Sequence, residues 1–127
     1  MSHKKFVTAI NCMDGRTQEP LINWAKEKFG ADYIDMINEP GPDKVLLTDD
    51  KNFFNYTLKK IKISTEKHGS KLLIIVGHYD CAGNPVSKEE HINFVKESIK
   101  TVKTLLSGID IIGIYINENW EVEELEI

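Results

Sequence analysis

The sequence predicts a single-domain α/β protein with a mainly parallel central sheet of about four strands plus an edge strand, flanked by helices. Strand-like and helix-like patterns alternate along the 127 residues, as in chains built from βα units. Residues 72–76 are an unbroken apolar run, which indicates a strand covered on both faces. No linker or internal repeat divides the chain, so residues 1–127 are predicted to form one domain.

The first elements follow from apolar runs and their boundaries. Residues 6–11 form a short apolar run and are predicted to be a strand. Residues 21–29 have helical spacing; Pro20 suits the first turn of this helix, and Gly30 lies just past its end. The segment 33–37 is predicted to be the second strand.

A loop and a long helix are expected next. The segment 38–42 (Asn-Glu-Pro-Gly-Pro) is predicted to be a loop, because two prolines and a glycine interrupt both helices and strands. Residues 49–68 are predicted to be helical, with Gly69 as the cap. The apolar stripe of this helix consists of Phe53, Phe54, Leu58 and Ile61.

The last third of the chain predicts one helix and two strands. The segment Ser-Lys-Glu-Glu at 87–90 fits a capping box, which opens a helix that ends before Gly108. Residues 109–116 resemble a buried strand, and 121–127 alternate like an edge strand. The apolar side of the helix carries Ile92, Val95, Ile99, Val102 and Leu106.

Composition excludes several classes of function. The formal net charge of −4 predicts no nucleic-acid-binding surface. No run of 18 apolar residues predicts a membrane span, and the N-terminus lacks the pattern of a signal peptide. We therefore expect a cytoplasmic protein, in which two cysteines more often bind metal or act in redox chemistry than form a structural disulfide.

Both cysteines lie in short polar motifs that follow predicted strands. The motifs are Cys-Met-Asp-Gly-Arg at 12–16 and Gly-His-Tyr-Asp-Cys at 77–81. Because ligands of open α/β sheets bind at the carboxyl ends of the strands, Cys12, His78 and Cys81 are expected to converge. Two sulfurs and one imidazole suit Zn²⁺ and leave a fourth position open, as in catalytic zinc sites. Alternatively, each cysteine taken singly could be a small core residue.

The two motifs together resemble the zinc signature of the β-class carbonic anhydrases. Gly77 matches the glycine that precedes the family's histidine, and 37–41 occupies the place of the family's Arg-Asn-Ala-Gly loop. Residues 113–115 and the turn at Trp120 resemble the family's closing strand pair. The resemblance extends over most of the chain, and the two zinc motifs are its specific part.

The resemblance implies a zinc lyase of the carbonate dehydratase type, with one Zn²⁺ per chain. Its zinc ligands would be Cys12, His78 and Cys81. Asp14 and Arg16 would be the catalytic pair; the structural alternative is a local ion pair. Zinc-bound hydroxide would hydrate CO₂ reversibly to bicarbonate.

Four further residues near these motifs have expected roles. Gly83 suits a close backbone approach and could direct N–H groups towards an oxyanion. Asp80 could orient His78, or be a solvent-facing turn residue. Gln18 is the candidate for the glutamine hydrogen-bond donor of the family. We expect His91 to be a surface histidine, with proton relay as the alternative.

The chain also departs from the family. It is shorter than typical members and lacks their N-terminal helices, so a simple homodimer is the expected assembly. Ala82 replaces a glycine, and the 38–42 loop replaces a basic one. These differences leave three alternatives to CO₂ hydration open. They are hydrolysis of a CO₂-like molecule such as carbonyl sulfide or carbon disulfide, a non-catalytic zinc domain, and a redox site that lacks the usual CxxC spacing.

Overall fold

The computed structural model describes residues 4–126. A five-stranded sheet with the order β2-β1-β3-β4-β5 runs through its centre. The strands are β1 (Phe6–Cys12), β2 (Tyr33–Glu39), β3 (Leu72–His78), β4 (Asp110–Ile116) and β5 (Val122–Glu124). The first four are parallel, and β5 pairs antiparallel with β4. The predicted α/β fold class and edge strand are therefore confirmed.

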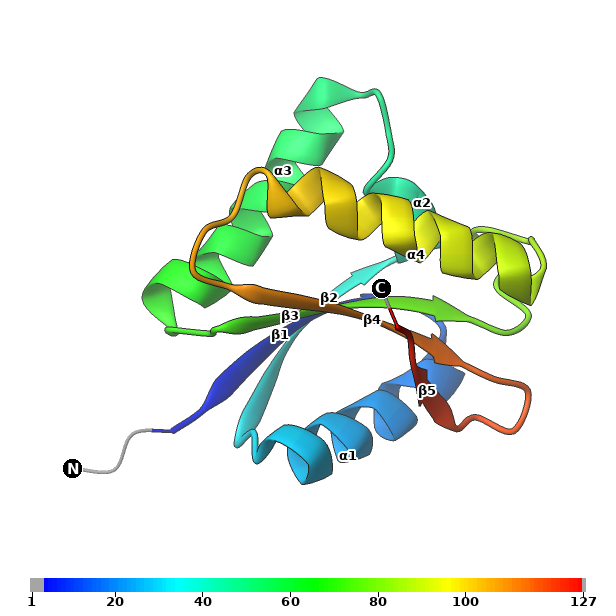
Figure 1. Cartoon of the computed structure of the whole chain (residues 1–127), viewed down its shortest axis with the longest axis horizontal. Helices are drawn as coiled ribbons and strands as arrows, with labels where there is room; N and C mark the ends of the chain where they lie inside the picture. Colours follow the sequence, from blue (N-terminus) through cyan, green and yellow to red (C-terminus); the bar gives the residue numbers. More distant parts are fainter. Residues whose placement is uncertain (1–3, 127) are drawn as a thin grey trace.

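Helices cover both faces of the sheet (Figure 1). One face carries α1, and the other carries α2, α3 and α4. The helices are α1 (Gln18–Phe29), α2 (Pro42–Val45), α3 (Lys51–Lys62) and α4 (Lys88–Lys103). A 3-10 turn, η1 (Gly15–Thr17), precedes α1, and a π-helical turn, η2 (Ile63–Lys67), continues α3. No helix among residues 4–126 is long and apolar enough to cross a membrane.

The central strand β3 explains the unbroken apolar run. Ile74 and Val76 pack into the core beneath α1, whereas Leu73 and Ile75 pack against α3 and α4. All four side chains are fully buried. Because successive strand residues point to opposite faces, a strand covered on both sides needs an apolar residue at every position.

The predicted helix boundaries near Gly30 and Ser87 are confirmed by the caps. Gly30 has a φ of 64° and donates its N–H to the carbonyl of Lys26, which closes α1. Ser87 and Glu90 form both hydrogen bonds of the predicted capping box.

Several predicted boundaries were wrong. β2 extends through Asn38 and Glu39 into the predicted loop, because these residues pair with the end of β1. Pro42 is the first residue of α2 rather than part of the loop, as suits proline in a first helical turn. α4 ends at Lys103, so Leu106 of the predicted apolar side lies beyond the helix. β5 covers only three residues, and position 127 of the predicted edge strand lies outside the described residues.

The apolar stripe predicted for the helix at residues 49–68, which corresponds to α3 and η2, was also partly wrong. Ile61 is fully buried, but Phe53 remains 39% exposed. The buried face of α3 consists of Thr57 and Ile61 and continues into η2 with Ser64. The small polar residues are accepted because their hydroxyls find partners: Thr57 donates to the carbonyl of Phe53, and Ser64 to the Asp35 carboxylate.

Candidate metal centre

Three potential metal ligands meet at the carboxyl edge of the sheet. Cys12 is the last residue of β1, and His78 is the last residue of the neighbouring strand β3. Cys81 follows in the loop after β3. One ligand atom from each side chain lies within 4.8 Å of the other two, and all three residues are buried. The predicted convergence of Cys12, His78 and Cys81 is therefore present.

The geometry of this cluster fits a small, soft cation. The two cysteines are free, and their sulfurs are 3.9 Å apart. Two thiolates about 2.3 Å from a tetrahedral Zn²⁺ would lie about 3.8 Å apart. The observed spacing thus matches one edge of a zinc tetrahedron.

The orientation of His78 supports the same assignment. Its Nδ1–H donates to the carbonyl of Tyr79 at 2.7 Å. Because a carbonyl only accepts, the proton of the neutral ring is on Nδ1 and the free lone pair is on Nε2. Nε2 is buried and has no hydrogen-bond partner within residues 4–126. A buried lone pair of this kind calls for a ligand, and a metal ion beside two sulfurs supplies one.

The two sulfurs are electrostatically coupled. The hydrogen bond with Cys81 lowers the pKa of Cys12 to about 3, whereas the same contact raises the pKa of Cys81. Backbone N–H groups of Gly41 and Asp14 also lower the pKa of Cys12. Deprotonation of one sulfur therefore disfavours deprotonation of the other, and a cation bound beside both sulfurs would offset this repulsion.

Two glycines allow the loop after β2 and the loop that carries Cys81 to approach closely. A Cβ at Gly83 would lie 2.5 Å from the carbonyl carbon of Pro40 and 2.6 Å from the nitrogen of Gly41. Gly41 has a φ of 64°, and a Cβ there would lie 2.9 Å from both Gly83 and Asn84. The close backbone approach predicted for Gly83 is present, but its neighbour is this loop. The backbone N–H groups of Gly83 and Asn84 lower the pKa of Cys81, against the larger opposite effect of Cys12.

Asp14 and Arg16 form a two-pronged ion pair beside the cluster. Arg16 Nε and Nη2 donate to Asp14 Oδ1 and Oδ2 at 3.0 and 2.6 Å. The backbone N–H of Arg16 also donates to Oδ1 at 2.9 Å. These bonds lower the pKa of Asp14 to about 2, so it is ionised at neutral pH.

Arg16 has two further partners. Its Nη1 lies 3.3 Å from Asp80 Oδ2, and its Nη2 donates to the Asp80 carbonyl at 3.2 Å. Its guanidinium carbon lies 4.5 Å from the centre of the Trp120 ring. The suggested role of Asp80 in orienting His78 was wrong: the Tyr79 carbonyl holds that ring, and the Asp80 side chain is 68% exposed.

Gln18 and Asn38 support the backbone below the cluster. Gln18 Nε2 donates to the carbonyls of Cys12 and Asp14 at 2.8 and 3.1 Å. Asn38 Nδ2 donates to the same Cys12 carbonyl at 3.0 Å and to Gln18 Oε1 at 3.1 Å. Gln18 thus fixes the chain that carries Cys12 and Asp14.

Sequence reasoning missed a second buried polar cluster. His91 was expected at the surface, but it is 1% exposed and its Nδ1 lies 2.6 Å from Asp43 Oδ2. Asp43 is fully buried and also accepts from Asn84 Nδ2 at 3.3 Å. A signal was present: His91 lies four residues before Val95, on the apolar stripe of α4.

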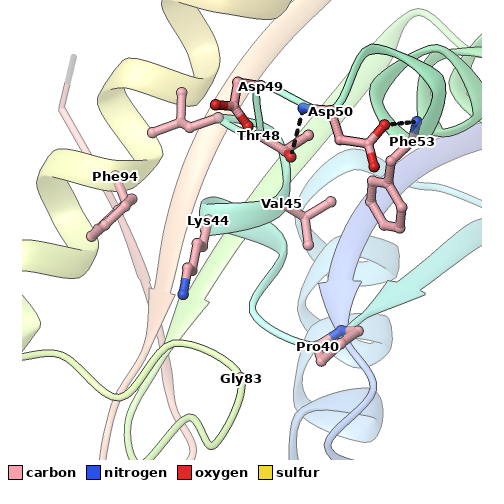
Figure 2. A pocket seen from close by; sticks show the side chains of 10 residues that line it. Pro40, Lys44, Val45, Thr48, Asp49, Asp50, Phe53, Gly83 and Phe94 are labelled. Atoms are coloured by element: carbon pink, nitrogen blue, oxygen red, sulfur yellow. Dashed lines mark hydrogen bonds between the residues drawn. The ribbon is translucent and has the colours of Figure 1, made fainter.

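A pocket of about 670 Å³ lies beside this region (Figure 2). Figure 2 shows the side chains of Lys44 and Phe94 at its wall, with Pro40 and Gly83 at the lower end of the view. Its lining, taken from the described residues, includes neither Cys12 nor His78 nor Cys81. The lining residues are Pro40, Lys44, Val45, Leu47, Thr48, Asp49, Asp50, Phe53, Gly83 and Phe94.

The fold and the cluster define an α/β protein with a Cys-His-Cys site for one metal ion. The sequence matches, over residues 2–126, the protein family described as "Putative carbonic anhydrase", and the chain belongs to that family. The β-class carbonic anhydrase resemblance is therefore confirmed, and zinc is the metal that this cluster suits. No curated protein matches the sequence.

Solved structures share the fold at low sequence identity. The β-carbonic anhydrase CafA of Aspergillus fumigatus is 15% identical with a TM-score of 0.64, and the match covers 98% of this chain and 76% of that one. Carbonic anhydrase from Streptococcus mutans is 20% identical with a TM-score of 0.64, and the match covers 99% of this chain and 86% of that one. A tetrameric β-carbonic anhydrase from Sordaria macrospora is 15% identical with a TM-score of 0.61, and the match covers 100% of this chain and 83% of that one.

Proposed function

We propose that this chain is a zinc lyase of the carbonate dehydratase type that interconverts CO₂ and bicarbonate. Cys12, His78 and Cys81 would hold one zinc ion. Asp14 and Arg16 would be the catalytic pair. The observation that carries the proposal is the free Nε2 of His78, buried beside two sulfurs and next to the Asp14–Arg16 ion pair. A purely structural zinc site has no need of that pair.

Zinc would supply Lewis acidity and lower the pKa of bound water towards about 7, which makes a nucleophile available at neutral pH. The residues of the chain would supply the geometry. His78 is held in the required tautomer by the Tyr79 carbonyl. Two buried thiolates would supply the negative charge that balances the divalent ion.

Asp14 would orient the proton-bearing oxygen of the substrate. Its pKa of about 2 keeps it ionised, and an ionised carboxylate can only accept hydrogen bonds. It would therefore favour bicarbonate, which carries one hydroxyl, over anions that carry none. Arg16 fixes the plane of the carboxylate through two parallel hydrogen bonds.

Metal analysis combined with stopped-flow CO₂ hydration tests the proposal. We expect about one zinc per chain and measurable hydration by the wild-type protein. Cys81→Ser should lose both zinc and activity. Asp14→Ala should keep zinc but lose most of the turnover, whereas Trp24→Phe, on α1, should retain both.

The same preparation separates the alternatives. Carbonyl sulfide and carbon disulfide are assayed beside CO₂, since a reshaped pocket could favour these CO₂-like molecules. A zinc-loaded wild-type protein that converts none of the three would contradict the enzyme proposal and favour a non-catalytic zinc domain. A metal-free protein with a Cys12–Cys81 disulfide would favour the redox alternative.

The proposal includes a cytoplasmic homodimer. The solved Sordaria macrospora relatives are described as tetrameric, so assembly beyond the monomer has a precedent in this fold. Sedimentation equilibrium should give about twice the mass of one 14.5 kDa chain. A mass equal to that of one chain would contradict this part of the proposal.

A further inference from the structure

Arg16 contacts Asp14, two residues before it, and two residues that are distant in the sequence, Asp80 and Trp120. The Asp14 carboxylate accepts hydrogen bonds from Arg16 Nε and Nη2. The Asp80 carboxylate accepts one from Arg16 Nη1, and the Asp80 carbonyl accepts one from Nη2. The indole of Trp120, from the turn between β4 and β5, lies over the guanidinium at 4.5 Å. We call this arrangement of Asp80 and Trp120 around the Asp14–Arg16 pair the Arg16 clamp.

Backbone strain is concentrated in the same place. Asp80 and Trp120 have φ values of 56° and 59°, and within residues 4–126 they are the only non-glycine residues with positive φ. Side chains with a Cβ disfavour this region. Such strain persists where the surrounding structure enforces it, typically at functional sites. Both strained residues contact Arg16.

The turn that presents Trp120 is firmly built. Asn117 Oδ1 accepts from the backbone N–H groups of Asn119 and Glu121 at 2.9 and 3.1 Å. The N–H of Trp120 donates to the Asn117 carbonyl at 2.9 Å. Tyr79 packs edge-on against the indole, with ring centres 6.4 Å apart. These contacts hold the turn and the indole independently of Arg16.

The Asp14–Arg16 pair depends on a fixed geometry, because the Arg16 side chain is partly exposed to solvent. The Arg16 side chain is 47% exposed, and ion pairs at such sites contribute little because solvent screens them. Asp14 lies only two residues after Cys12, so a carboxylate released from Arg16 could compete for the fourth position of a metal at the cysteine cluster. Stacking on an indole adds a partner that does not depend on an oppositely charged group.

We propose that Asp80 and Trp120 are positioning residues that hold Arg16 on Asp14 and so prevent the Asp14 carboxylate from becoming the fourth metal ligand. This inference rests on the proposed zinc site. The clamp determines whether exogenous anions reach the metal, because a coordinated Asp14 would occupy their place.

Thiocyanate titration of the cobalt-substituted protein, followed by visible absorption, tests the clamp. Trp120→Leu should weaken thiocyanate binding roughly threefold to fivefold, the equivalent of one cation–π contact. Trp120→Phe should restore most of the affinity, since an aromatic face remains. Asp80→Asn should have a smaller effect, because asparagine also tolerates positive φ and only the charge is lost.

Trp24→Leu is the matched control. Trp24 also lies near a cation, with Lys28 Nζ 5.6 Å from its ring, but this contact belongs to α1. Loss of the Trp24 ring should change the stability of the protein without changing its affinity for thiocyanate. A fluorescence measurement on metal-free Trp24→Phe protein, in which Trp120 is the remaining tryptophan, should show altered emission after Arg16→Ala.

The outcomes separate the clamp from the zinc site. Trp120→Leu protein that binds cobalt and thiocyanate as the wild type does would overturn the clamp and leave the zinc site intact. Equal losses in Trp120→Leu and Trp120→Phe would overturn the stacking role. Wild-type protein that takes up neither zinc nor cobalt would overturn the proposed zinc site and the clamp with it.

Discussion

His78 and His91 are both buried, and each has one ring nitrogen fixed and the other free. His78 donates Nδ1–H to the Tyr79 carbonyl, and His91 Nδ1 pairs with the Asp43 carboxylate. In both rings Nε2 is buried and has no hydrogen-bond partner in the described chain. The local arrangement is therefore almost the same in the two regions.

Their surroundings differ. His78 lies beside the sulfurs of Cys12 and Cys81, whereas His91 lies beside the ring of Tyr115, with ring centres 6.0 Å apart. A fixed imidazole is therefore not sufficient for a metal site, because the charge and softness of the other donors decide. The two regions are joined by Asn84, which lies in the loop that carries Cys81 and donates its side-chain amide to Asp43.

The strongest test of this comparison removes each ring in turn. His78→Ala should lower zinc affinity more than about 100-fold, because even changes outside the ligand set cost about 10-fold to 100-fold. His91→Ala should lower it less than about 10-fold. Competition with a chromophoric chelator measures both. Similar losses in the two variants would show that His91 matters to the metal as much as His78 does.

The second test concerns stability in the absence of metal. His91→Ala leaves the fully buried carboxylate of Asp43 without its main partner, and should lower the free energy of unfolding by about 3 kcal/mol or more. His68→Ala is the control, since His68 makes a 2.6 Å contact with Asp35 at a partly exposed position. Its cost should be about 1 kcal/mol. Equal costs in urea unfolding would contradict the structural importance of the buried pair.

The third test uses the glycine that lies between the two histidines. A Cβ at Gly77 would lie 3.3 Å from Asp43 Oδ2 and 3.3 Å from His91 Cβ. Gly77→Ala should therefore destabilise the metal-free protein by about 1–3 kcal/mol through overpacking. Gly15→Ala is the matched control, because nothing lies within 4 Å of a Cβ there. It should be neutral or slightly stabilising; a similar loss at both positions would contradict the packing argument.

The smallest expected effect is the pH dependence of the stabilisation that the Asp14–Arg16 ion pair provides. Arg16 lowers the pKa of Asp14 to about 2 from a usual value near 3.8. A depressed folded-state pKa stabilises the protein above the unfolded-state value, and this stabilisation is lost as the pH falls towards 2. The stability difference between wild type and Asp14→Asn should therefore be largest above about pH 5 and shrink on acidification. A difference that is constant between pH 6 and 3 would contradict it.

Much of this arrangement could be predicted because it depends on local spacing. The apolar run at 72–76 indicated a strand buried on both faces, and Cys12 and His78 each followed a predicted strand. The carboxyl ends of parallel strands lie at one edge of the sheet, so convergence followed from the pattern. The capping box at Ser87 was equally local.

Other features depend on contacts between distant segments. β2 continues through Asn38 and Glu39 because β1 lies beside it, although the residues themselves suggested a loop. The position of Trp120 over Arg16 joins residues more than 100 apart in the sequence. Nothing in the local sequence around either residue indicates the other.

The sequence by itself determined the donors, their order along the chain and the strands that carry them, because ligand type and strand periodicity are properties of neighbouring residues. Only the tertiary structure decided what each donor does. In the folded chain His91 is buried beside Asp43, and Asp80 pairs with Arg16 and not with His78. Nε2 of His78 is free beside two sulfurs. Burial and partner choice depend on which distant segments pack together, and a local pattern does not specify that.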